Sequence, residues 1–209
     1  TLTLASIATF ITILAGFFIV SAARFSKNTW FSRIASLGYA IPGTVLAIGL
    51  MLSLGALDHA VADFLEFQLG ISTGLLFLGT SFTLIYAYAV RFLAISIGSI
   101  ESGYNRIHGV LDDAARNLGQ NKRGILWAVH LPLLRPAIIS AALLIFVDCM
   151  KELPATLLLR PMNMETLATQ LYAEASRGTY EDGAIAALLI VVVGLIPVIL
   201  LARMSKTGR

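Results

Sequence analysis

The sequence is poor in charged residues and in cysteine. Charged side chains make up 13% of the 209 residues and 57% are hydrophobic, whereas about a quarter of the residues in a soluble domain are charged. So few charges cannot cover a water-exposed surface, and we therefore expect lipid to cover much of the chain. Cys149 is the only cysteine, which excludes an internal disulfide and a cluster of thiolate metal ligands.

Several motifs of other functional classes are also missing. The net charge of +3 is not gathered into one patch and no nucleic-acid-binding motif is present, so we expect no nucleic acid partner. The sequence contains no G-x-x-x-x-G-K-[ST] phosphate loop, which excludes ATP hydrolysis by that route, and no HExxH or serine elbow of an enzyme. His59, His108 and His130 lack metal-ligand spacing, so we predict no metal site and no cofactor bound by this chain.

Long apolar runs are what the sequence does contain. A membrane-spanning helix needs about 20 apolar residues, and four stretches reach that length without a charge, while Asp148, Lys151 and Glu152 interrupt a fifth. We predict an all-α, polytopic transmembrane bundle with spans at residues 1–23, 34–57, 67–90, 137–159 and 183–202. The sequence opens inside an apolar run at Thr1, and we interpret it as a fragment that lacks its first span.

The basic residues predict an orientation. Between Asp58 and Glu66 there are three carboxylates and no Lys or Arg. Most basic residues instead follow the first, third and last runs, and the positive-inside rule places these segments, with the C-terminus, in the cytoplasm. They are Arg24, Lys27, Arg33, Arg91, Arg106, Arg116, Lys122, Arg123, Arg135, Arg203, Lys206 and Arg209.

One cytoplasmic connection, residues 101–135, is longer than most connections between packed helices. In it, an apolar face at helical spacing predicts a short helix, Gly119 is a natural helix stop, and Pro132 suits the start of the next span. The face consists of Leu111, Ala114, Ala115 and Leu118, with Asp112 and Asp113 in the first turn. This helix–glycine–helix unit fits a groove on a soluble partner or, equally, the lipid surface.

The same connection resembles the EAA loop of binding-protein-dependent ABC import permeases. The family pattern is Glu-Ala-Ala, three residues, Gly, nine residues, Ile-x-Leu-Pro, and every spacing matches here; Asp replaces Glu and Val replaces Ile. The matching residues are Asp113, Ala114, Ala115, Gly119, Val129, Leu131 and Pro132. The resemblance implies that residues 101–135 form the coupling loop that fits a cleft on the ATPase subunit.

Two further segments look like those of ferric iron permeases. They are residues 38–47, with the sequence GYAIPGTVLA, and residues 151–161, with the sequence KELPATLLLRP. The likeness implies a type I ABC importer permease core in which residues 1–209 form one domain, the C-terminal half of a longer fused permease. It also implies a bacterial inner-membrane importer of ferric iron, which needs a separate ATPase dimer using ATP and Mg, a second permease half and a periplasmic binding protein.

Alternatives remain open at this point. Thiamine, polyamines and oxyanions move through relatives with the same loop, and a secondary transporter driven by an ion gradient is a candidate from another class. For the pathway we single out Pro42 and Gly43, as a hinge or close crossing in the second span. We also single out Asp148 and Glu152, which share a helix face that Lys151 could neutralise; the competing interpretation is that these charges lie at the outer interface.

Two smaller expectations complete the analysis. His130 occupies a variable position of the loop motif, so we expect an ordinary interfacial role for it. Residues 165–175 predict a short amphipathic outer helix, which either caps the external mouth or contacts a periplasmic binding protein.

Overall fold

The computed structural model describes residues 1–26, 28 and 30–207, and within them the chain is helical without a strand. The predicted all-α fold is confirmed. The elements are α1 (Leu2–Ser26), α2 (Trp30–Ala35), the 3₁₀ helix η1 (Ser36–Tyr39), α3 (Gly43–Leu69), α4 (Ser81–Tyr104), α5 (Gly109–Asn117), α6 (Lys122–Ile125), the π-helical turn η2 (Leu126–His130), α7 (Leu131–Lys151), α8 (Pro154–Leu159), α9 (Leu167–Arg177) and α10 (Tyr180–Thr207).

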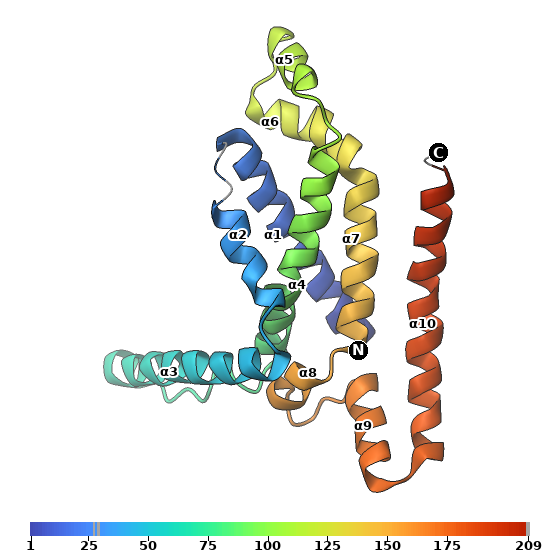
Figure 1. The fold of residues 1–209 in the computed structure, drawn as a ribbon. Helices are drawn as coiled ribbons and strands as arrows, with labels where there is room; N and C mark the ends of the chain where they lie inside the picture. Colours follow the sequence, from blue (N-terminus) through green and yellow to red (C-terminus); the bar gives the residue numbers. More distant parts are fainter. Residues whose placement is uncertain (27, 29, 208–209) are drawn as a thin grey trace.

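Helices α1, α4 and α7 pack against one another and form the centre of the bundle (Figure 1). Small side chains line these contacts: Ala8, Ala87 and Ala141 are fully buried. Gly16 on α1 approaches Ser96 on α4 so closely that a Cβ would lie 2.1 Å from the serine Oγ. Small residues let helices in membranes pack at short distance, where hydrophobicity alone gives no driving force.

Five helices are long and apolar enough to cross a membrane, by length and composition. The expected number of spans is therefore found among the described residues, and the chain is a multi-pass membrane protein. Four of these helices, α1, α4, α7 and α10, run along a common direction, and α10 packs at the edge against α7 and α9. We call the end of this bundle that carries α5 and α6 the α5 end, and the end that carries α8 and α9 the α8 end (Figure 1).

The predicted second span, 34–57, is not one helix. The chain runs through α2 and η1, breaks at residues 40–42, and continues as α3, which lies across the direction of the bundle helices (Figure 1). The backbone of Gly38 touches α4, since a Cβ there would lie 2.3 Å from the Val90 carbonyl oxygen, as close packing predicts. Pro42 is exposed and precedes the first residue of α3, so it ends one element and starts another and does not kink a continuous span.

The predicted third span, 67–90, is shifted along the chain. The observed helix, α4, begins at Ser81 and contains Arg91 near its middle, so Arg91 is not at a cytoplasmic edge as expected. Residues 70–80 form a loop that is held by Asp58 of α3, whose carboxylate accepts N–H bonds of 2.9 to 3.2 Å from Leu76, Phe77 and Leu78. Asp58 lies within α3, and not in a loop as expected. Its side chain is fully buried, and the N–H bonds offset the cost of burying its charge.

The predicted span 137–159 is also displaced. Its helix, α7, begins at Leu131 with Pro132 in the first turn and ends at Lys151, and Pro154 starts the separate helix α8. The last span extends from Tyr180 to Thr207, beyond the predicted residues at both ends. Lys27 and Arg209, two of the basic residues used to predict the orientation, lie outside the described residues.

Candidate functional site

Helices α5 and α6, with the turn between them, form a knob at the α5 end of the bundle (Figure 1), and this knob contains the motif residues from Asp113 to Gly119. Helix α5 ends at Asn117, and Gly119 follows with φ of +79°, a left-handed conformation that favours glycine. The Gly119 and Gln120 N–H groups bond back to the carbonyls of Arg116 and Ala115, which closes the helix end. The side chain of Asn121 then caps α6 by accepting the Gly124 N–H at 2.8 Å. The predicted helix, glycine turn and second helix are therefore present.

Helix α5 divides its side chains between the bundle and the surroundings. Ala115 and Asp112 are buried, whereas Val110 and Leu118 are 74% and 82% exposed. The expected apolar face is thus split: Ala115 packs inward, and Leu111, Ala114 and Leu118 are exposed. Asp113 is exposed as well and pairs with Arg116 at 3.0 Å within the helix. An exposed apolar face on a helix that the bundle holds in place is what a partner's groove would accept.

A buried pair, Asp112 and His130, holds α5 to the bundle. His130 Nε2 lies 2.8 Å from Asp112 Oδ1, and Arg24 of α1 contacts the second carboxylate oxygen at 3.3 Å. Burial acts to raise the pKa of the Asp112 carboxyl, but the hydrogen bond from His130, with Arg24, holds that pKa below its usual value. His130 is fully buried, so the expected interfacial role is wrong: the carboxylate and two aromatic rings enclose the imidazole.

The pair continues into the bundle as a chain of hydrogen bonds. His130 Nδ1 lies 3.2 Å from the Tyr104 hydroxyl on α4, which lies 2.8 Å from Ser21 Oγ on α1. Phe25 stacks on the imidazole from the other side, with centroids 5.6 Å apart. When the proton of the imidazole is on Nε2, this nitrogen donates to Asp112 and Nδ1 accepts from the Tyr104 hydroxyl, so both ring nitrogens have a partner. Four separate segments, α1, α4, α5 and η2, therefore meet at one imidazole, and sequence spacing alone gave no signal of this.

The last three motif residues join the knob to α7. Val129 lies in the π-helical turn η2, and Leu131 and Pro132 open α7. Such single π turns inside helices recur at functional sites. Here the turn carries His130 directly before α7, so the imidazole that binds α5 is continuous with a membrane helix.

The α8 end holds a second buried ion pair, between Arg91 and Glu152. Arg91 Nε lies 3.2 Å from Glu152 Oε2, and its Nη1 donates to the Ile41 carbonyl at 3.0 Å. Gly43 is packed against this pair, since a Cβ there would lie 2.7 Å from Glu152 Oε1. The structure thus brings together two of the predicted pathway residues, Gly43 and Glu152.

The other two pathway residues make no polar contact with this pair, although Pro42 lies between Ile41 and Gly43, which both touch it. Pro42 is exposed, and Asp148 pairs with Lys151 at 2.8 Å. Lys151 therefore neutralises Asp148, as expected. The partner of Glu152 is Arg91 and not Lys151. Among the described residues no group of three or more His, Cys, Asp or Glu side chains could hold a metal ion.

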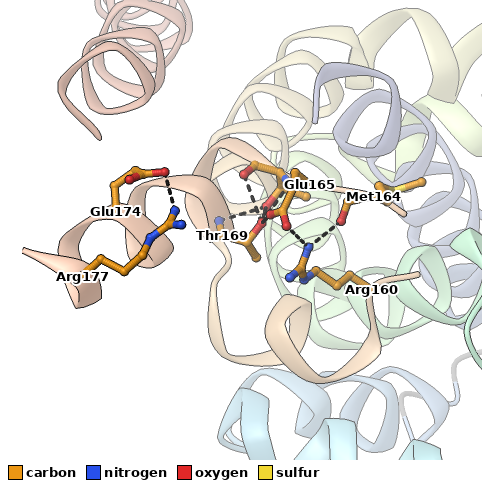
Figure 2. A network of polar contacts seen from close by, with 7 residues as sticks. Arg160, Met164, Glu165, Thr169, Glu174 and Arg177 are labelled. Atoms are coloured by element: carbon orange, nitrogen blue, oxygen red, sulfur yellow. Dashed lines mark hydrogen bonds and ion pairs between the residues drawn. The ribbon is translucent and has the colours of Figure 1, made fainter. Parts of the chain in front are cut away.

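The segment after α8 is ordered by its own polar contacts. Figure 2 shows Arg160 between the Met164 carbonyl and the Glu165 carboxylate, and Thr169 donating to the same carboxylate at 2.8 Å. The bond from Thr169 and the charge of Arg160 hold the pKa of Glu165 below its usual value. Thr166 caps the helix that follows. The predicted outer helix is found as α9, Leu167–Arg177, beginning two residues later than expected.

In its sequence the chain is similar to several ABC transporter permeases. No family model matches it. An Fe(3+)-transport system permease protein of Haemophilus influenzae is 28% identical over 175 residues, which are 83% of this chain and 31% of that protein. A putative 2-aminoethylphosphonate transport system permease protein of Salmonella typhimurium is 27% identical over 177 residues, which are 85% of this chain and 61% of the relative. The chain therefore spans less than two thirds of the length of these relatives.

The fold has a solved counterpart. A bacterial alginate ABC transporter, crystallised with a pentasaccharide-bound periplasmic protein, contains a chain that matches 99% of this one with a TM-score of 0.71 at 19% identity, over 76% of its own length. At that identity the match concerns the fold alone. The sequence relatives, ferric transport permeases among them, agree with the resemblance that the loop motif indicated.

Proposed function

We propose that this chain is the transmembrane part of an ATP-driven ABC importer and that α5 is its coupling helix. The observation that carries the proposal is the exposed apolar face of α5, presented on a knob that buried polar contacts fix to the bundle. In the proposed complex the motif residues meet a cleft of a separate ATPase subunit. They are Asp113, Ala114, Ala115, Gly119, Val129, Leu131 and Pro132.

The polar anchor explains how such a knob could move the spans. A force on α5 reaches α7 through the Asp112–His130 contact, and α4 and α1 through Tyr104 and Arg24. Each side chain in this series of polar contacts is buried or has a bonding partner on both sides. Helix α5 therefore moves together with the adjoining ends of α1, α4 and α7. ATP binding that closes an ATPase dimer would thereby shift the spans between inward and outward access.

The proposed assembly has several further members. We propose that the α5 end faces the cytoplasm of a bacterial inner membrane, that the chain pairs with a second permease half, and that a periplasmic binding protein delivers the substrate at the α8 end. ATP and Mg would act in the ATPase dimer, because this sequence has no phosphate loop.

We propose ferric iron as the substrate, supported by the relatives named for ferric transport and by the segments at 38–47 and 151–161. The carboxylate of Glu152 offers an oxygen ligand of the kind that hard cations prefer, although Arg91 engages it in this conformation. The second candidate is 2-aminoethylphosphonate, which the Salmonella relatives favour by name.

Reconstitution of the full-length parent with its ATPase and binding protein tests the proposal. Uptake of labelled ferric iron into proteoliposomes is measured with and without ATP, for the parent and for Gly119→Asp. Gly70→Asp is the matched control, since Gly70 ends α3 with a positive φ of +63° and, like Gly119, has no neighbour that a Cβ would meet.

We expect ATP-dependent iron uptake in the parent and in Gly70→Asp, and its loss in Gly119→Asp. If ATP is hydrolysed and labelled aminoethylphosphonate enters while iron does not, the second substrate replaces the first. Uptake that needs no ATP, or that survives in Gly119→Asp, contradicts the coupling role.

A further inference from the structure

A cavity of about 560 Å³ opens between α1, α2 and α4 at the α5 end. Its wall combines two guanidinium groups, a carboxylate and hydroxyl groups, which come from three different helices. The residues that matter here are Arg24, Ser32, Arg33, Glu101 and Tyr104. None of the motif residues lines it, and transport through the bundle as proposed above assigns it no role.

Three of these polar groups are unused by the protein itself. Ser32 lines the cavity but is only 1% exposed, and its buried hydroxyl has no hydrogen-bond partner in the described part of the chain. Neither Arg33 nor Glu101 has an ion-pair partner among the residues that the structure describes. A buried hydroxyl without a partner is costly, so a ligand that accepts its proton would be bound favourably.

The charges of the wall select the kind of ligand. Arg24 already shares its charge with Asp112 at 3.3 Å, which leaves one guanidinium, that of Arg33, and one carboxylate, that of Glu101. A ligand with one phosphate and one ammonium group matches this pair, whereas a ligand with only negative charge would meet the Glu101 carboxylate unfavourably.

The surface of α2 and η1 beside the cavity indicates where such a ligand comes from. Trp30, Phe31, Ile34 and Leu37 are each more than half exposed. Aromatic side chains of this kind gather at the boundary between lipid headgroups and acyl chains, and basic pockets between helices at that level bind lipid headgroups. An apolar helix surface next to a polar cavity offers separate places for the chains and the headgroup of one lipid.

We propose that this cavity binds the headgroup of a zwitterionic phospholipid that carries a primary amine. Its phosphate accepts from Arg33 and the Ser32 hydroxyl, and its ammonium group pairs with Glu101. Arg24 and Tyr104 belong both to this wall and to the contacts that hold α5. A bound headgroup therefore touches the anchor of the knob.

Native mass spectrometry of the purified full-length parent tests the assignment without an ATPase, so its outcome is independent of the coupling proposal. The protein is titrated with phosphatidylethanolamine, with phosphatidylglycerol and with free phosphoethanolamine. The variants are Glu101→Gln and Ser32→Ala. Arg106→Gln serves as the control, because Arg106 is an exposed arginine at the same end outside the cavity.

We expect phosphatidylethanolamine to bind more tightly than phosphatidylglycerol, and Glu101→Gln to weaken it about tenfold, as loss of one charged hydrogen bond does. Ser32→Ala should weaken both lipids, and Arg106→Gln neither. Equal binding of the two lipids in the parent, or an unchanged affinity in Glu101→Gln, overturns the proposal. Free phosphoethanolamine that binds as tightly as the lipid overturns the lipid source and assigns the cavity to a soluble ligand of the same chemistry.

Discussion

Helices α5 and α3 both expose apolar side chains, but they do so in different ways. On α5 the exposed apolar residues occupy one side of a nine-residue helix, and the other side is fixed by a buried carboxylate and Ala115. Helix α3 lies across the bundle (Figure 1). Large apolar side chains are exposed along its whole length, among them Val45, Leu52 and Phe67. A small face on a fixed support suits docking to one partner, whereas a broad apolar surface suits lipid or other membrane helices.

The largest loss of stability is expected from removing the imidazole that holds α5 to the bundle. His130→Ala leaves the Asp112 carboxylate buried with Arg24 as its remaining partner and opens a void between Phe25 and Tyr104. Breaking a buried charged contact of this kind costs about 3 kcal/mol of unfolding free energy. Thermal unfolding in detergent measures it, with His108→Ala, an exposed histidine of the same connection, as the control. Equal stability of the two variants would contradict the anchoring role.

The support of α3 is tested at Asp58. In Asp58→Ala the N–H groups of Leu76, Phe77 and Leu78 lose their acceptor, so hydrogen exchange of these amides should accelerate about tenfold or more. Exchange in α5 should not change. Asp63→Ala is the control, because Asp63 lies on the same helix and is exposed. Faster exchange at α5 in Asp58→Ala would show that the two regions are not independent.

A pH dependence sharpens the description of the α5 anchor. The pKa of Asp112 is lowered in the folded protein, so the ionised carboxylate contributes stability above its ordinary pKa of 3.8, and this contribution is lost as the pH falls through the lower folded value. The stability difference between the parent and Asp112→Asn, about 1 kcal/mol, should thus be constant from neutral pH to about pH 5 and shrink only in stronger acid. A difference that disappears already near pH 6 would place the titrating group elsewhere.

The smallest effect on stability is expected at the exposed face of α5. Leu118→Ser removes a side chain that is 82% exposed, so the unfolding free energy should change by less than about 0.5 kcal/mol. Iron uptake per ATP hydrolysed in proteoliposomes should nevertheless fall, since the docking face is altered. Phe67→Ser on α3, also highly exposed, should leave that ratio unchanged. A normal ratio in Leu118→Ser would argue against docking through this face.

The α5 connection could be predicted from sequence because its determinants are local. The left-handed backbone at position 119 favours glycine, and proline is tolerated in the first turn of α7, where Pro132 lies. The motif fixes the spacing between these two residues. Such signals involve neighbouring residues and do not depend on how the helices pack. These signals predict the helix, the turn and the helix boundary at Pro132, whereas hydropathy places the span itself six residues too late.

The partners of buried charges could not be predicted in this way. Asp112 and His130 are 18 positions apart and meet only after the chain reverses, and Arg91 and Glu152 come from different spans. Hydropathy also merged α2, η1 and α3 into one run, because residues 34–57 are apolar on both sides of the break. A charge within an apolar run was the available signal: Arg91 and Glu152 have opposite signs, and each would be costly in a membrane without the other.

The guanidinium of Arg91, on α4, connects two other segments of the chain. It donates to the Ile41 carbonyl at the break at residues 40–42, and it pairs with Glu152 at the corner between α7 and α8. The two corners are consequently linked in their energetics, because a movement that separates either one from α4 removes a partner from the same buried charge. The remaining bond must then stabilise a guanidinium that is only partly exposed. We therefore expect opening at the break and opening at the α7–α8 corner to be cooperative.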